Sequence, residues 1–161
     1  MKLYLYQIDA FTDKVFGGNP ACVIHLHKWL EDEKLLKIAQ ENAVSETAFF
    51  VQNDDFFHLR WFTPDIEMDL CGHATLAAAY VIKKHLKFPK DVISFKTLSG
   101  KLNVHVNHEN FTLDFPSRKP VISELPLIIK KSLSIQPKKI LKSRDYFLVY
   151  NNQKEIEEIQ I

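Results

Sequence analysis

The sequence predicts an α+β fold in which a curved sheet wraps a central buried helix. Three observations support this prediction. The spacing of apolar residues switches repeatedly between the strand period of two and the helical period of about 3.6. Segment 72–83 is apolar on every side of a helical wheel apart from Thr75, and a helix of that kind is normally surrounded by protein. Strand patterns occur both before and after this segment.

The elements that precede the central helix are strands and one amphipathic helix. Strand patterns rich in apolar and aromatic residues occupy 3–8, 21–27, 47–52 and 56–62. The turn residues of 17–20 separate the first two strands. Residues 30–42 begin with acidic side chains and continue with apolar residues at helical spacing, which predicts a helix facing the sheet.

The elements that follow the central helix begin with more strands and end in a less regular region. Strands are predicted at 92–97, 102–106 and 111–115. After Pro116 and Pro120 the pattern predicts a helix at 124–133, a strand at 146–150 and the start of a further element at 155–161. We therefore expect an N-terminal domain over residues 1–118 and the start of a second domain, incomplete here, over 119–161.

Composition excludes several function classes. The chain has 161 residues with 21 Lys+Arg, of which only three are arginines, against 20 Asp+Glu, so it lacks the basic field that nucleic acids require. The uncharged run 70–82 is too short to span a membrane, and residues 1–20 lack the layout of a signal peptide, so we expect a cytoplasmic protein. Cys22 and Cys71 show no disulfide or metal-ligand spacing, and we expect no metal and no cofactor.

The sharpest local motif is Cys71-Gly72-His73-Ala74 at the start of the buried helix. The first N–H groups of a helix have no intrahelical partners, and a glycine there lets a ligand approach, so the motif predicts an anion site that suits a carboxylate. The alternative is that Gly72 only eases a turn between strand and helix, and that His73 is an exposed or locally bonded imidazole.

Glu46 is a lone carboxylate in the small and apolar stretch 44–50. A carboxyl group in such surroundings can move a proton near neutral pH. The alternative is a capping or surface glutamate, because Ser45 and Thr47 are ordinary turn residues. Cys22, in an apolar strand, is expected to be a small core residue.

Several sequence blocks occur together in a fixed order. They are Asp9 to Phe11, Gly18-Asn19-Pro20, Ser45-Glu46-Thr47, Arg60-Trp61-Phe62-Thr63-Pro64, Glu67 to Leu70, Gly72 to Leu76, Thr97 to Leu102 and Leu113 to Pro116. In this order the blocks resemble the phenazine-biosynthesis PhzF-like isomerase family, over essentially the whole chain. The resemblance implies two similar domains, each a barrel-like sheet around a central helix, with the active site in the cleft between them. It also implies the fold shared by diaminopimelate epimerase and proline racemase.

The resemblance assigns roles to particular residues. Glu46 matches the acid/base that moves a proton between substrate carbons without a cofactor. Gly72 and His73 match residues that hold the substrate, partly through helix N-terminal amides. Ala74 of the same block and Asn19 of the Gly18-Asn19-Pro20 block are also expected to bind the substrate. The substrate expected from these roles is a small carboxylate-bearing metabolite.

Two departures from the family pattern define alternatives. Cys71 stands where many members have a small residue, so the block also resembles that of proline racemase, whose cysteine is a base. A cysteine-based racemase needs a second cysteine facing the first, and Cys22 lies in the wrong block. The later family motif with an acidic residue and a loop rich in glycine and serine is absent. The chain is therefore expected either to pair with a second copy or a separate half, or to be a non-catalytic remnant that dimerises and binds an anion.

Overall fold

The computed structural model describes residues 2–14 and 16–161. The chain divides into two compact units, one ending at Phe115 and one beginning at Pro116. This division falls slightly before the boundary expected after residue 118. Among the described residues, no helix combines the length and the apolar composition needed to cross a lipid bilayer.

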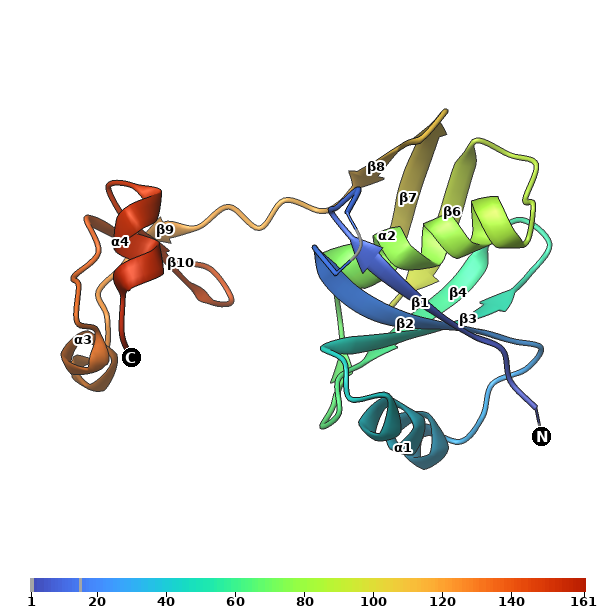
Figure 1. Ribbon diagram of the computed structural model, residues 1–161, viewed down its shortest axis with the longest axis horizontal. Helices are drawn as coiled ribbons and strands as arrows, with labels where there is room; N and C mark the ends of the chain where they lie inside the picture. The colour runs from blue at the N-terminus through green and yellow to red at the C-terminus, as the bar shows by residue number, and fades with distance from the viewer. Residues whose placement is uncertain (1, 15) are drawn as a thin grey trace. The chain divides into compact units, whose positions relative to one another are not determined.

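The first unit is built on one mixed, curled sheet (Figure 1). Its strands are β1 (Leu5–Ala10), β2 (Asn19–Leu26), β3 (Glu46–Gln52), β4 (Phe57–Phe62), β5 (Glu67–Met68), β6 (Val92–Thr97), β7 (Gly100–Asn107) and β8 (Asn110–Asp114). Their order is β1-β2-β3-β4-β6-β7-β8, with β5 paired to β4. The β2–β3 and β4–β6 pairs are parallel, whereas the other pairs are antiparallel. All the strands predicted for this unit form, and the two-residue β5 is an addition.

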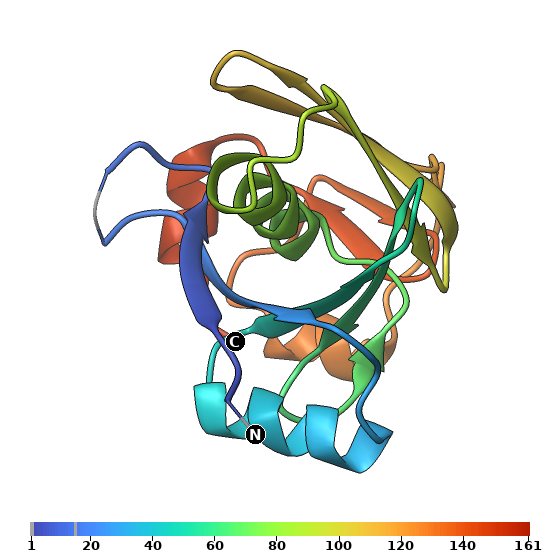
Figure 2. The ribbon, with the colours of Figure 1, turned by 90° about the vertical axis from the view of Figure 1, so that its right-hand side faces the viewer.

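Helix α2 (Gly72–Tyr80) runs through the curl of the sheet, as the view along the helix shows (Figure 2). Ala74, Ala77, Ala78 and Ala79 have no exposed surface, and small side chains let strands on several sides approach the helix closely. The central buried helix is thus confirmed. Its regular part ends before the expected residue 83 and continues as a π-helical turn, η1 (Val81–His85), which keeps the adjacent Val81 and Ile82 both in the core.

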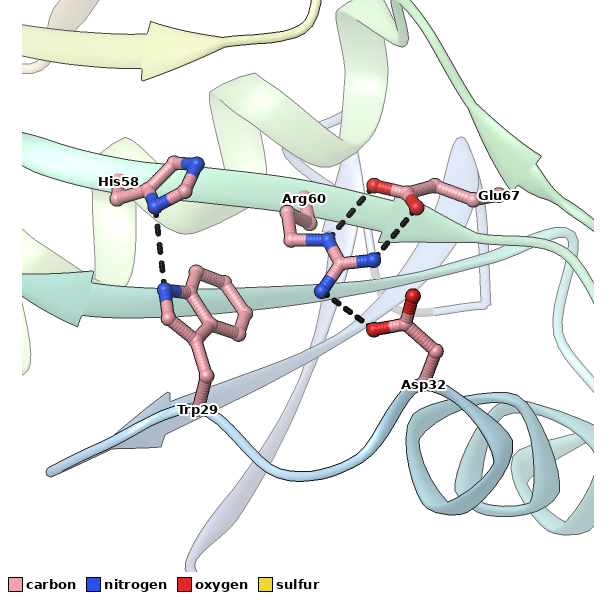
Figure 3. Close-up of polar contacts among 5 residues, drawn as sticks. All are labelled: Trp29, Asp32, His58, Arg60 and Glu67. Atoms are coloured by element: carbon pink, nitrogen blue, oxygen red, sulfur yellow. Dashed lines mark hydrogen bonds and ion pairs between the residues drawn. The ribbon is translucent and has the colours of Figure 1, made fainter.

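The opposite face of β2–β4 packs on helix α1 (Asp32–Asn42), which buries Leu35 and Ala39. Arg60 of β4 links several elements on this face through hydrogen bonds (Figure 3). Its guanidinium donates two parallel hydrogen bonds to the Glu67 carboxylate at 2.7 and 2.6 Å and a third to Asp32 of α1 at 2.8 Å. The same group lies over the ring of Trp29, whose Nε1 donates to His58 Nδ1 at 3.1 Å. The Arg60 cluster therefore connects α1, β4 and β5.

The second unit is small and has little core. It contains β9 (Val121–Ile122), α3 (Leu127–Ser132), β10 (Lys139–Lys142), β11 (Tyr146–Val149) and α4 (Gln153–Glu158). Its sheet has the order β11-β10-β9. The predicted strand at 146–150 forms, whereas the predicted helix begins only after Pro126, whose backbone at the N-cap is not helical. Leu133 is buried, while Ile122 and Ile128 are 80% and 77% exposed.

Candidate active site

The parallel pairing of β2 and β3 brings two distant sequence blocks to one end of the sheet. Ala21 is the register partner of Glu46, so the start of β2, with Asn19 and Pro20, lies beside the start of β3. The first turn of α2 reaches the same place, because His73 contacts residues at the start of β3. The fold thus brings Asn19, Glu46 and His73 to one place.

The imidazole of His73 is the centre of the site. Its Nε2 lies 3.3 Å from Glu46 Oε2 and 3.2 Å from Ser45 Oγ. Its Nδ1 lies 3.5 Å from the sulfur of Cys71. The residue is only 9% exposed, so the imidazole is not an exposed one, and its contacts are both local, with Cys71, and distant in the sequence, with Ser45 and Glu46.

Ser45 extends the contacts of the site to the start of β2. Its hydroxyl lies 3.3 Å from Asn19 Oδ1 and 3.5 Å from the carbonyl oxygen of Pro20, both of which it can reach as a donor. The sequence indicated a turn residue at Ser45 and did not predict that its hydroxyl contacts His73 and Asn19. Its position directly before Glu46 was the available signal.

Burial sets the protonation of the two titratable partners on α2. Desolvation lowers the pKa of His73, against the opposing effects of the Glu46 carboxylate and a hydrogen bond to Pro20, so the ring is neutral at neutral pH. Burial raises the pKa of the Cys71 thiol to about 12, and the Ala74 amide only partly offsets this rise. Cys71 is therefore a neutral thiol, which is the opposite of what a thiolate base requires.

The entrance to α2 has no side-chain cap. Cys71 occupies the N-cap in an extended conformation and makes no geometric cap hydrogen bond, although the Ala74 amide lies close enough to the thiol to lower its pKa slightly. A Cβ added to Gly72 would meet only Phe115 Cε2, at 3.9 Å, which is an ordinary contact. The left-handed glycines among the described residues are Gly18 and Gly100, so the backbone at Gly72 does not need glycine either. These facts disfavour the interpretation that Gly72 only eases a turn, and they leave room for a ligand beside the helix amides.

Three residues here could also donate to a metal ion. Glu46, Cys71 and His73 offer donor atoms that all lie within 4.8 Å of one another, which the sequence spacing did not predict because Glu46 is far away in the chain. Carboxylate, thiolate and imidazole are donors that zinc accepts. Glu46 and Cys71 flank opposite nitrogens of the ring, however, so their donor atoms do not converge on one ring nitrogen.

Comparison with known proteins assigns the family. The model of the phenazine biosynthesis-like protein family, PhzC-PhzF, matches residues 8–144. The chain belongs to this family. An uncharacterized isomerase from Pseudomonas aeruginosa is 45% identical over 156 residues, which make up 97% of this chain and 60% of that protein.

Solved structures agree with this assignment. The crystal structure of a PhzF-family phenazine biosynthesis protein from Enterococcus faecalis matches with a TM-score of 0.89 at 38% identity, covering 99% of this chain and 62% of that one. A protein from Pseudomonas aeruginosa described as a predicted epimerase matches with a TM-score of 0.71 at 19% identity, covering 99% and 64%, and shows the shared fold. The epimerase-like fold expected from the resemblance is thus confirmed. The chain spans only 60% of the length of the Pseudomonas isomerase and 62% of the Enterococcus chain.

Proposed function

We propose that this PhzF-like chain supplies one wall of an isomerase active site that moves a proton between carbons of a small carboxylate-bearing metabolite without a cofactor. The observation that carries the proposal is the contact of the Glu46 carboxylate with His73 at 3.3 Å, beside the uncapped start of α2. A proton acceptor and an anion-binding helix end are the two groups that such a reaction needs in one place.

Each residue has a chemical role in the proposed reaction. Glu46 takes a proton from one substrate carbon and returns it to another, so it acts first as a base and then as an acid. The amides of Gly72, His73 and Ala74, at the positive end of the α2 dipole, hold the substrate carboxylate. His73, neutral and nearly buried, orients the Glu46 carboxylate. Asn19 is linked to His73 through the hydroxyl of Ser45, which contacts both residues.

The cysteine-based racemase is the weaker alternative. Cys71 is a neutral thiol because burial raises its pKa to about 12, and its sulfur faces the His73 ring. Cys22 follows Ala21 on β2, and Ala21 packs in the core around α2. Strand alternation therefore directs Cys22 to the opposite face of the sheet, away from Cys71.

A second candidate function is anion binding without turnover. It rests on the start of α2, where no side chain caps the helix, because those amides can hold a carboxylate whether or not Glu46 moves a proton.

Exchange of carbon-bound hydrogen separates the two candidates. The chain is incubated in deuterated buffer with a panel of small amino and unsaturated carboxylic acids, and deuterium incorporation is followed by NMR. The isomerase proposal predicts incorporation at a specific carbon of at least one acid. Shifts of the Gly72, His73 and Ala74 amide signals without incorporation into any acid would favour the anion-binding protein.

A further inference from the structure

The two nitrogens of the His73 ring have different surroundings, and the difference identifies which one carries the proton. Nε2 lies 3.3 Å from the Glu46 carboxylate and 3.2 Å from the Ser45 hydroxyl. An ionised carboxylate can only accept hydrogen bonds. The hydroxyl of Ser45 can donate to Asn19 or Pro20, which leaves its lone pairs free to accept. The Glu46 carboxylate and the Ser45 hydroxyl can therefore both accept at Nε2, and a proton on Nε2 lets the ring donate to the carboxylate.

The opposite nitrogen then needs a donor. A neutral imidazole with its proton on Nε2 has a lone pair on Nδ1, and a buried acceptor without a partner is costly. The group facing Nδ1 is the sulfur of Cys71, at 3.5 Å, and both residues are buried. A thiol donates an S–H bond, whereas a thiolate would repel both the Nδ1 lone pair and the Glu46 carboxylate.

We propose that Cys71 is a positioning residue that donates its S–H to Nδ1 of His73 and thereby holds the ring as the Nε2–H tautomer directed at Glu46. Its catalytic relevance rests on the proposed role of Glu46. The cysteine acts through His73 and does not touch the substrate. Hydrogen bonds at the two ring nitrogens thus connect the Cys71 thiol, through His73, to the carboxylate of Glu46.

Nitrogen-15 NMR of the His73 ring tests the assignment in this chain without any substrate. The wild type should show a protonated Nε2 and an unprotonated Nδ1 with the chemical shift of a hydrogen-bonded acceptor. Cys71→Ala should move the Nδ1 signal toward that of a free ring nitrogen, whereas Cys71→Ser, whose hydroxyl also donates, should leave it near the wild-type position. Cys22→Ala, which removes the other buried thiol, is the matched control and should leave the ring signals unchanged.

Infrared spectra of the S–H stretch give an independent readout. The band lost in Cys71→Ala should lie at lower frequency than the band lost in Cys22→Ala, because donation to Nδ1 weakens the S–H bond. A protonated Nδ1 in the wild type, or an Nδ1 signal that stays in place in a folded Cys71→Ala, would overturn the proposal. If Cys71→Ala does not fold, the wild-type tautomer and the Cys71→Ser spectrum decide. Since neither measurement uses turnover, failure of the proposed function leaves their outcome unaffected.

Discussion

Gly72 offers a test that separates a structural glycine from a functional one. Its backbone is not left-handed, and an added Cβ would meet only Phe115 Cε2, at 3.9 Å. Nothing in the fold therefore requires glycine there. We predict that Gly72→Ala stabilises the protein and weakens carboxylate binding, because the new methyl group occupies the space through which an anion reaches the helix amides.

The magnitude of the stabilisation follows from this geometry. Alanine in a compatible backbone conformation lowers the entropy of the unfolded chain and stabilises by about 0.4–1 kcal/mol. For a protein of this size the change corresponds to a rise in Tm of about 1–4 °C. Gly18→Ala is the matched control, because Gly18 has φ +71° and an added Cβ would lie 2.3 Å from the Ala10 carbonyl oxygen. That substitution should destabilise by at least about 2 kcal/mol.

Two assays check the prediction. Chemical denaturation gives the free energies of unfolding, and titration with acetate, followed through the amide signals of Gly72, His73 and Ala74, gives the carboxylate binding. The reasoning would be refuted if Gly72→Ala destabilised the protein, since the glycine would then be structural. Equal acetate-induced shifts in wild type and variant would show that no anion approaches at this residue.

Three further predictions follow. Arg60→Met should lower the free energy of unfolding by about 2–4 kcal/mol, because Glu67 loses its paired donor in a partly buried position. Asp32→Ala, which removes an exposed partner of Arg60, should cost under about 1 kcal/mol in urea denaturation, and equal losses would contradict the cluster geometry. Burial lowers the pKa of three histidines, namely His25, His58 and His73. The unfolded chain therefore binds more protons below about pH 6.5, so the free energy of unfolding should fall as the pH is lowered from 7.5 to 5.5; a rise would refute this. The exposed apolar side chains of the second unit predict self-association, which light scattering should detect and Ile128→Lys should weaken, whereas a monomeric wild type would contradict it.

Much of the fold was predictable because the apolar pattern of most strands is local. The alternation of Phe57, Leu59 and Trp61 gives β4, and the run of alanines from residue 77 gives the buried helix. The two-residue strands β5 and β9 were missed because segments so short show no alternation, and β10 was missed because its two apolar residues are adjacent and flanked by lysines. The end of α2 was placed too late, since the π-helical turn keeps the apolar pattern of a helix.

The candidate site was predictable only in part, for a different reason. Glu46 and His73 were identified from their own surroundings and the family blocks, and the fold brings them together. The contacts of Cys71 and Ser45 with opposite sides of the ring depend on the β2–β3 register and on the geometry of the first turn of α2. Neither the strand register nor the geometry of that turn is visible as a sequence pattern. From the sequence alone, Cys71 therefore suggested a catalytic base.

The central claim is that Glu46 moves the proton, and the most direct measurement is hydrogen exchange between solvent and a substrate carbon in Glu46→Gln. The amide keeps the shape of the side chain but cannot accept the proton. The account predicts that exchange falls about 10²- to 10⁴-fold in Glu46→Gln and only mildly in Cys71→Ala. The reverse ranking, with exchange surviving in Glu46→Gln and lost in Cys71→Ala, would contradict the account and identify the cysteine as the base.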